Sequence, residues 1–274
     1  MGARKTRRAD FLARNPLCCF CGGLTQASTE DHIPARALFF RRGWPEGYVF
    51  PACGVCNGHS AEDELFMAFL VRVTVRPTTL EESTERQKAI AGIKARHPDF
   101  FPNFKKLSRN EFRRRAHEIG GLGQFGIETT SVTMVSMPPL AMEVATRYGQ
   151  KLGKALHYRH TEEILPNSGD TWAWVMTNAV IPALEIPAEL FGPLTSAPKA
   201  KVRRGSVDLD YQFSYRYLIV EEGLASCFLV TLGQSMTILV VALRFRGDIA
   251  SSPQGEGIPK FFNEAALPGD PLEI

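Results

Sequence analysis

The amino-acid sequence predicts an α+β protein in which a cysteine-rich N-terminal module precedes a mixed domain of helices and an antiparallel β-meander. Two Cys-x-x-Cys pairs lie near the start of the 274-residue chain. A four-residue apolar repeat indicates a long helix in the middle of the chain, and alternation of aromatic and polar residues indicates a strand near its end. We place the boundary near Val75, which gives domains of residues 1–75 and 76–274 that we expect to fold separately.

Composition favours a soluble globular protein. Apolar residues make up 44% of the chain and charged residues 22%, which is ordinary for this class. No apolar run follows the basic N-terminus, so a signal peptide is not expected. The longest apolar run, residues 236–243, is too short to cross a bilayer. We therefore expect a cytoplasmic protein without a membrane partner, whose thiols stay reduced.

Five of the six cysteines lie in the first quarter of the chain. Reduced cysteines in this arrangement are typical of metal ligands. The four that form the two Cys-x-x-Cys pairs are Cys18, Cys21, Cys53 and Cys56. Four thiolates close the coordination shell of Zn²⁺, so we expect a structural zinc rather than a catalytic one. Cys19 is an alternative to Cys18 only through a less suitable Cys-x-Cys spacing, and Cys227 is expected to be a buried strand residue.

The N-terminal 42 residues carry eight basic and three acidic residues, whereas the whole chain has a net charge of only +3. A basic end beside a candidate site favours a polyanionic partner such as nucleic acid. The alternative is an arm that is simply solvated. The residues expected to contact phosphates are Arg4, Lys5, Arg7, Arg8, Arg36, Arg41 and Arg42.

The remaining elements follow from periodicity and turn residues. Ser60 is expected to cap a helix that runs to about Val73, because three acidic residues follow it in the first turn. Further helices are expected at residues 80–96, 110–119 and 139–160, and a weakly alternating strand at 125–137. The long helix carries an apolar stripe at Leu140, Val144, Tyr148, Leu152 and Leu156. The meander is expected to use residues 211–219, 224–232 and 235–245.

Between the cysteine pairs lie residues suited to phosphodiester hydrolysis. That reaction needs an activated water and a cation that stabilises developing charge. His32 can accept the proton from the water. Asp31 and Asn57 offer a carboxylate and an amide oxygen, which suit a hard ion such as Mg²⁺ or Mn²⁺.

Residues 31–39 (DHIPARALF), 51–57 (PACGVCN) and 60–64 (SAEDE) resemble the zinc-bearing, four-cysteine branch of the HNH endonucleases, also called ββα-metal or His-Me finger nucleases. The resemblance covers about residues 15–70. It implies an N-terminal ββα-metal module, His32 as the general base, and Asp31 and Asn57 as ligands of a catalytic divalent ion. It also implies a nucleic-acid substrate, with DNA favoured over RNA.

The chain departs from this family at one point. The asparagine that in many members orients the base has no match, and residues 47–50 (GYVF) stand in its place. A backbone carbonyl of Tyr48 or Val49 is then expected to orient His32. His59 is an alternative metal ligand, although as a polar residue near a helix start it needs no such role. Glu64 contributes either through a water or only as a helix carboxylate.

Other polar and aromatic groups have simpler explanations. His157 and His160 could pair on a metal, but a cationic helix C-terminus explains them better. The basic run 113–115 is either a phosphate contact or a solvated helix face. Phe100, Phe101 and Phe104 are expected in the core or against a partner rather than stacked on bases.

The function predicted from the sequence is a metal-dependent HNH endonuclease, by family analogy a bacterial or phage defence or restriction-type effector. One alternative is an adaptor that kept the zinc knuckle and lost catalysis. Another is a nuclease subunit that becomes active only within a complex. The C-terminal domain would then supply the contact with a protein partner or with a second copy of the chain.

Overall fold

The structure is a computed structural model, and it describes residues 3–73, 77–103, 108, 110–111, 114, 138–177, 193–220, 223–233 and 236–245. The expected strand at 125–137 lies outside these residues, as does most of the expected helix at 110–119. Within the described part of the chain, no helix is both long and apolar enough to cross a membrane.

The described elements form one larger sheet, two small hairpins and several helices. The described helices include α1 (Ala3–Arg14), α2 (Gly54–Val73), α3 (Leu80–Arg96) and α5 (Pro139–Thr161), with short 3-10 turns η1 (Arg36–Leu38), η2 (Phe40–Arg42) and η3 (Pro98–Asn103). The small hairpins pair β1 (Thr29–His32) with β2 (Val49–Ala52) and β4 (Arg203–Arg204) with β5 (Val207–Asp208). The protein is therefore mixed α+β with antiparallel sheets, as the sequence predicts.

The larger sheet has the strand order β3-β8-β7-β6 and is antiparallel throughout. Its strands are β3 (Asp170–Thr177), β6 (Phe213–Val220), β7 (Ala225–Leu232) and β8 (Met236–Leu243). The predicted meander of the last three strands is confirmed. Strand β3, which pairs along its whole length with β8, was not expected from the sequence.

Both faces of this sheet are covered by apolar side chains, which explains why β3 was missed. Val175 on one face belongs to the main core, whereas Trp172 on the other face belongs to a separate cluster that includes Leu194. A strand buried on both faces reads as an apolar run without the alternation that identifies a half-exposed strand.

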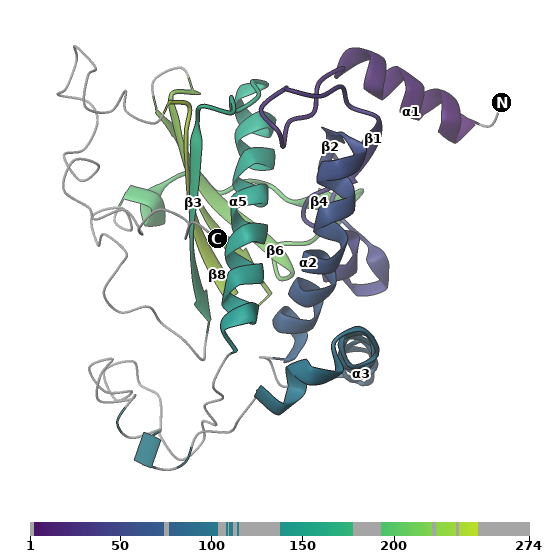
Figure 1. The fold of residues 1–274 in the computed structure, drawn as a ribbon, viewed down its shortest axis with the longest axis vertical. Helices are drawn as coiled ribbons and strands as arrows, with labels where there is room; N and C mark the ends of the chain where they lie inside the picture. The colour runs from purple at the N-terminus through teal and green to yellow at the C-terminus, as the bar shows by residue number, and fades with distance from the viewer. Residues whose placement is uncertain are drawn as a thin grey trace.

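Helix α5 lies between the sheet and α2, and it links the two parts of the chain (Figure 1). Its predicted stripe is buried except at its first residue, Leu140, which is 40% exposed. Gly153 faces the sheet so closely that an added Cβ would lie 2.4 Å from Cγ1 of Val240 and 3.0 Å from Cγ2 of Thr171. The helix can approach β8 and β3 at this distance only because glycine has no side chain.

One hydrophobic core extends across the predicted boundary near Val75. The ring of Tyr48 packs edge-on against Phe213 at 5.6 Å between centroids, and its hydroxyl donates to the hydroxyl of Tyr215 at 3.2 Å. The hydroxyl of Tyr148 accepts a hydrogen bond from the backbone N–H of Ala35 at 3.0 Å. Removal of the first 75 residues would expose these aromatic side chains, so the packing argues against the separate folding expected from the sequence.

The start of α2 corrects one prediction. The helix begins at Gly54, so Ser60 lies in its second turn and does not cap it. The Ser60 hydroxyl instead lies 3.0 Å from the backbone oxygen of Asn57. Asn57 and Ser60 consequently lie on the same helix, three residues apart, and Asn57 contacts Thr29 of β1.

We predict that Gly153→Ala destabilises the protein by about 1–3 kcal/mol, because the methyl group would overlap Val240 and force helix and sheet apart. Gly58→Ala is the matched control, since a Cβ at this position of α2 would meet nothing within 4 Å. Alanine there should stabilise the helix by about 0.5–1 kcal/mol. Denaturant unfolding of both variants checks the pair, and equal effects would contradict the packing argument.

Candidate functional site

Four cysteines converge at one point beside β1 and α2. The sulfur atoms of Cys18, Cys21, Cys53 and Cys56 all lie within 4.8 Å of one another. Cys18 and Cys21 belong to the loop before β1, whereas Cys53 and Cys56 lie at the start of α2. Four sulfurs at this separation can hold a metal ion such as zinc, which agrees with the spacing in the sequence.

Two glycines allow the cysteine loop to turn tightly enough for this convergence. Gly22 and Gly23 adopt left-handed conformations with φ of 68° and 76°, which glycine alone adopts readily. A Cβ at Gly22 would lie 2.4 Å from the backbone nitrogen of Asn167, so the loop also needs glycine for close packing. The N–H of Cys19 donates to the carbonyl oxygen of Pro51 at 3.0 Å, which ties the loop to β2.

The other two cysteines are buried apolar residues. Cys19 is 1% exposed, and its sulfur is not part of the four-sulfur group. Burial is the main reason why the pKa of the Cys19 thiol lies well above its ordinary value. Cys227 is buried on β7, as predicted, and burial raises its pKa to about 12.

A polar pocket of about 350 Å³ lies next to the four-cysteine group. Its lining comes from α1, β1, η1, η2 and α2, and brings together residues that the sequence analysis selected separately. The lining residues are Arg8, Thr29, Glu30, Asp31, His32, Arg36, Ala37, Arg42, Asn57 and Glu64. Asp31, His32 and Asn57 therefore share one pocket with three of the predicted phosphate-contacting arginines.

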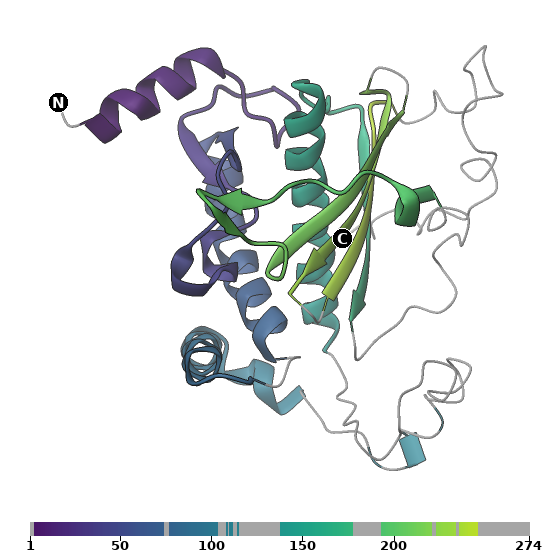
Figure 2. The same ribbon diagram turned by 180° about the vertical axis from the view of Figure 1, so that it is seen from behind.

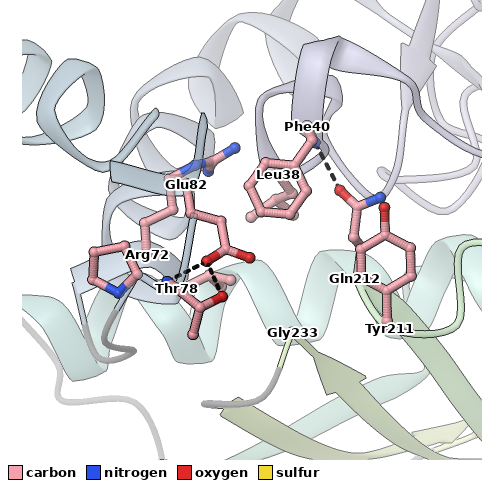
Figure 3. Close-up of a pocket in the computed structure, with 10 residues that line it drawn as sticks. Leu38, Phe40, Arg72, Thr78, Glu82, Tyr211, Gln212 and Gly233 are labelled. Atoms are coloured by element: carbon pink, nitrogen blue, oxygen red, sulfur yellow. Dashed lines mark hydrogen bonds between the residues drawn. The ribbon is translucent and has the colours of Figure 1, made fainter. Parts of the chain in front are cut away.

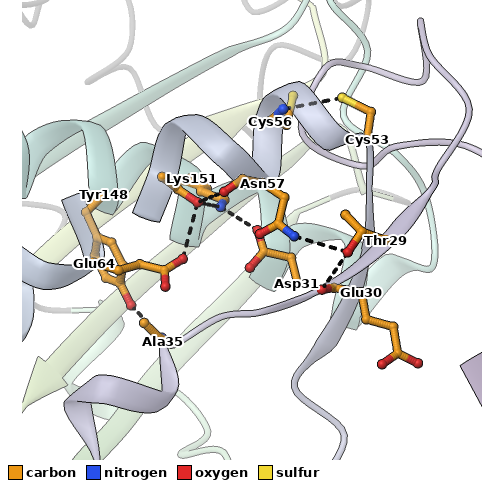
Figure 4. A network of polar contacts seen from close by, with 11 residues as sticks. Thr29, Glu30, Asp31, Ala35, Cys53, Cys56, Asn57, Glu64, Tyr148 and Lys151 are labelled. Carbon is orange, nitrogen blue, oxygen red and sulfur yellow. Dashed lines mark hydrogen bonds and ion pairs between the residues drawn. The ribbon is translucent and has the colours of Figure 1, made fainter. Parts of the chain in front are cut away.

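Asp31 is the most deeply buried acid of the pocket, with 3% of its surface exposed. Its Oδ2 forms an ion pair with Nζ of Lys151, a residue of α5 that also donates to the hydroxyl of Ser60 (Figure 4). Asn57 lies on the same side and donates from Nδ2 to Oγ1 of Thr29 at 3.2 Å. Lys151 was not identified from the sequence, because 120 residues separate it from Asp31.

Glu64 also faces the pocket, and its Oε1 accepts a hydrogen bond from Ser60 at 3.2 Å. Burial raises the pKa of Glu64 to about 7, the Asp31 carboxylate adds to this shift, and Lys151 opposes it. Perturbed carboxylates of this kind are typical of functional pockets. Because α2 begins at Gly54 and not after Ser60, Glu64 is a pocket residue rather than a first-turn helix carboxylate.

His32 is held by Trp44 and Arg36. Its ring packs edge-on against Trp44 with 5.3 Å between centroids, and Nε2 is in contact with the Arg36 guanidinium. Since a guanidinium can only donate, Nε2 is the acceptor and the ring proton lies on Nδ1. The Arg36 guanidinium also lies 3.8 Å above the Trp44 ring. Trp44 was not identified from the sequence.

The two arginines of η2 point to different places. Arg41 and Arg42 both adopt left-handed backbone conformations, with φ of 50° and 55°, which cost about 1–2 kcal/mol for residues other than glycine. Arg42 lines the pocket, whereas Arg41 forms an ion pair with Glu81 at 2.6 Å. Strained backbone is commonly retained at functional sites, where it directs a side chain. Here the strained conformation at residue 42 goes with a side chain that lines the pocket.

The β4–β5 hairpin crosses from the sheet to the pocket side of the molecule (Figure 2). The Arg204 guanidinium lies 4.3 Å from the centre of the Trp44 ring and donates to the Trp44 carbonyl oxygen at 3.0 Å. The N–H of Glu46 donates to the carbonyl oxygen of Arg203 at 2.9 Å. Trp44 is thus in contact with two guanidiniums, one from each part of the chain, and the hairpin adds exposed positive charge beside His32.

The remaining predicted site residues lie outside the pocket lining. His59 is exposed on α2, and Lys5 and Arg7 are exposed on α1. Arg4 also belongs to α1, but its side chain is outside the described residues. Phe100 is buried in the core, as expected, whereas the side chains of residues 101 and 104 are not described.

The histidines near the end of α5 are neutral rather than cationic, which corrects the explanation given from the sequence. His157 is buried with its Nδ1 2.8 Å from the hydroxyl of Ser226, and His160 places Nε2 3.0 Å from the hydroxyl of Tyr215. Burial lowers the pKa of each to about 4. Both histidines therefore serve as packed hydrogen-bonding groups of the core.

A second cavity, of about 130 Å³, lies between η2, the end of α2 and the start of β6 (Figure 3). Leu38, Val71 and Pro77 make part of its wall apolar, and Gln212 beside it accepts a hydrogen bond from the N–H of Phe40 at 2.7 Å. No residue predicted to take part in catalysis or metal binding lines this cavity. The residues expected to take part in catalysis, Asp31, His32 and Asn57, line the polar pocket instead.

No family model, curated protein or solved structure matches this chain.

We predict about one zinc ion per chain, bound by the four converging cysteines. Cys53→Ser should abolish metal binding and unfold the cysteine loop with β1 and β2, because metal-binding free energy, on the order of 10 kcal/mol, is folding free energy in such sites. Cys227→Ala is the control and should keep the full zinc content. Elemental analysis together with thermal melting checks both, and metal-free native protein would contradict the assignment.

Proposed function

We propose that the protein is a metal-dependent endonuclease of the HNH type that cuts nucleic acid in the polar pocket. The observation that carries the proposal is that Asp31, His32 and Asn57 line one pocket on a β-hairpin and the helix that follows it, beside the four-cysteine group. This order of two strands and a helix agrees with the resemblance of residues 15–70 to that family.

The donor set of the pocket suits a hard divalent ion. Asp31 and Glu64 offer carboxylate oxygens and Asn57 an amide oxygen, which are the ligand types that Mg²⁺ and Mn²⁺ prefer. Among the described residues, only the four cysteines form a tight group of three or more His, Cys, Asp or Glu ligands. Mg²⁺ needs few protein ligands, because it keeps several waters and would share its shell with a phosphate. The ion would stabilise negative charge on the phosphate during cleavage.

Each pocket residue has a separate role in the proposed reaction. His32 presents an unprotonated Nε2, which accepts the proton of the attacking water once the Arg36 guanidinium turns to a phosphate oxygen. Trp44 keeps the imidazole plane fixed during this exchange. Arg8 and Arg42 bind the phosphates on either side and place the scissile bond near His32.

The charge of the pocket rim favours a nucleic-acid substrate. Arg8, Arg36 and Arg42 line the pocket, and the β4–β5 hairpin adds Arg203 and Arg204 at its edge. Contacts of this kind bind the backbone without regard to sequence. We favour DNA because it is the usual substrate of the family that the sequence resembles. A role in bacterial or phage defence stays a prediction from that resemblance.

A second candidate function is a nucleic-acid-binding adaptor or a nuclease subunit that needs a partner. Two contacts favour it: Lys151 already neutralises Asp31, and Arg36 already occupies Nε2 of His32. In this arrangement Asp31 has its counter-charge without a divalent ion. Binding to nucleic acid without cleavage under any divalent ion would support this candidate over the solitary enzyme.

We predict that His32→Ala lowers the rate of plasmid nicking by about 10²–10⁴-fold in Mg²⁺ or Mn²⁺, the usual contribution of a general base. Zinc content and melting temperature should stay nearly unchanged, because His32 is not a sulfur ligand. His59→Ala is the matched control and should cut like the wild type, since His59 is exposed outside the pocket. Equal cleavage by wild type and His32→Ala would disprove the assigned base.

The two arginines of η2 supply a test of substrate binding. We predict that Arg42→Ala weakens binding to duplex DNA and reduces the slope of log affinity against log salt by about 1, the loss of one phosphate contact. Arg41→Ala, with the same backbone conformation and its side chain on Glu81, should change neither. Fluorescence anisotropy across a salt series measures both, and identical slopes for the two variants would remove Arg42 from the phosphate-binding surface.

A further inference from the structure

Lys151 is a cation placed on the protein side of the pocket. Its side chain is 13% exposed, that of Asp31 is 4% exposed, and the two form an ion pair. Asp31 lines the pocket, whereas Lys151 does not. The positive charge therefore lies behind the carboxylate, in the interface between α5 and α2, and does not face an incoming substrate.

The ammonium group is fixed from several sides. Besides Asp31, it contacts the hydroxyl of Ser60, and it lies 4.7 Å from the centre of the Phe20 ring, which belongs to the cysteine loop. Ser60 in turn donates to Glu64. Lys151 is thus connected to the buried Asp31 directly and to the half-buried Glu64 through a hydroxyl (Figure 4).

This arrangement changes what the pocket offers to a divalent ion. A carboxylate attracts a cation less strongly when an ammonium group already neutralises it, and the ammonium itself repels the ion through the low-dielectric interior. The same ion pair also stabilises the fold when no divalent ion is bound, because a buried carboxylate without a partner, such as Asp31, would lower the free energy of unfolding. Glu64 lies close to the same positive charge.

We propose that Lys151 is a resident cation that positions Asp31 and sets a weak affinity of the pocket for divalent ions, so that the ion binds tightly only together with a phosphate. Lys151 neutralises the negative charge of Asp31, and a substrate phosphate supplies a new negative charge that attracts the divalent ion. The divalent ion and the nucleic acid therefore bind cooperatively. This inference rests on the proposed function for the identity of the phosphate ligand, but Lys151's effect on bare ion affinity stands without it.

The test measures Mn²⁺ binding to full-length, zinc-loaded protein by electron paramagnetic resonance, without nucleic acid. Lys151→Met and Lys151→Gln should each bind Mn²⁺ at least about 10-fold more tightly than the wild type. Their melting temperatures should be lower than that of the wild type without Mn²⁺ and should rise more when Mn²⁺ is added, because the ion replaces the lost ammonium.

Lys154→Met is the matched control. Lys154 lies one turn further along α5, and its Nζ donates to the carbonyl oxygen of Phe20 at 3.1 Å rather than to an acid. This variant should bind Mn²⁺ like the wild type, even if its melting temperature falls. Lys151→Arg, which keeps the positive charge, should also retain weak Mn²⁺ binding.

Unchanged or weaker Mn²⁺ binding in both Lys151→Met and Lys151→Gln would overturn the inference, and it would leave the endonuclease proposal to the plasmid assay. If the two zinc-loaded variants are unfolded without Mn²⁺, recovery of the fold when Mn²⁺ is added supports the inference, and absence of recovery overturns it. If Mn²⁺ binds wild type tightly without DNA, and DNA does not tighten it further, the cooperative binding is excluded whether or not the protein cleaves DNA.

Discussion

The convergence of the two cysteine pairs is the constraint on which the pocket depends. Cys53 directly follows β2, and Cys56 lies in the first turn of α2, so their position relative to Cys18 and Cys21 fixes the angle at which the helix leaves the hairpin. That angle places Asn57 opposite Thr29, with Asp31 between the strand and the helix. A hairpin of two four-residue strands has too little apolar surface to hold this geometry alone.

Helix α5 is the second determinant, because it joins the sheet to the pocket. Its glycine face lets it lie directly on β3 and β8, while the opposite side packs against α2. Tyr148 and Lys151 on that side reach the segment around β1, one through the N–H of Ala35 and the other through Asp31. The larger sheet therefore supports the pocket through α5, and this contact gives the C-terminal part of the chain a structural role in the site.

The sequence was sufficient where a residue's role depends on neighbours close along the chain. The cysteine spacing predicted the metal-binding group, and periodicity predicted α5 and three strands of the larger sheet. The start of α2 was misplaced because Gly54, Asn57 and Gly58 are poor helix formers, and the cysteine pair stabilises a first turn that propensity alone would not favour. The contact of Lys151 with Asp31 was beyond sequence reasoning, since 120 residues separate the two. The only sign of its role in the sequence was its position: Lys151 follows Tyr148 by three residues, so its charge lies beside the apolar stripe of α5. Trp44 lies near His32 and Arg36 along the chain, but in an irregular segment whose residues show no periodicity that would bring the three together.

The charges around the pocket explain why the ion and the substrate should depend on each other. Glu30, Asp31 and Glu64 bring negative charge, and Arg8, Arg36 and Arg42 oppose it on the lining. Lys151 adds a fourth positive charge from behind against these three acids, so the pocket itself has no excess negative charge to attract a divalent cation. A phosphodiester brings that excess and also competes for the Arg36 guanidinium, which releases Nε2 of His32. The same binding event would then create the affinity for the ion and expose the base, which restricts hydrolytic chemistry to the time when nucleic acid is bound.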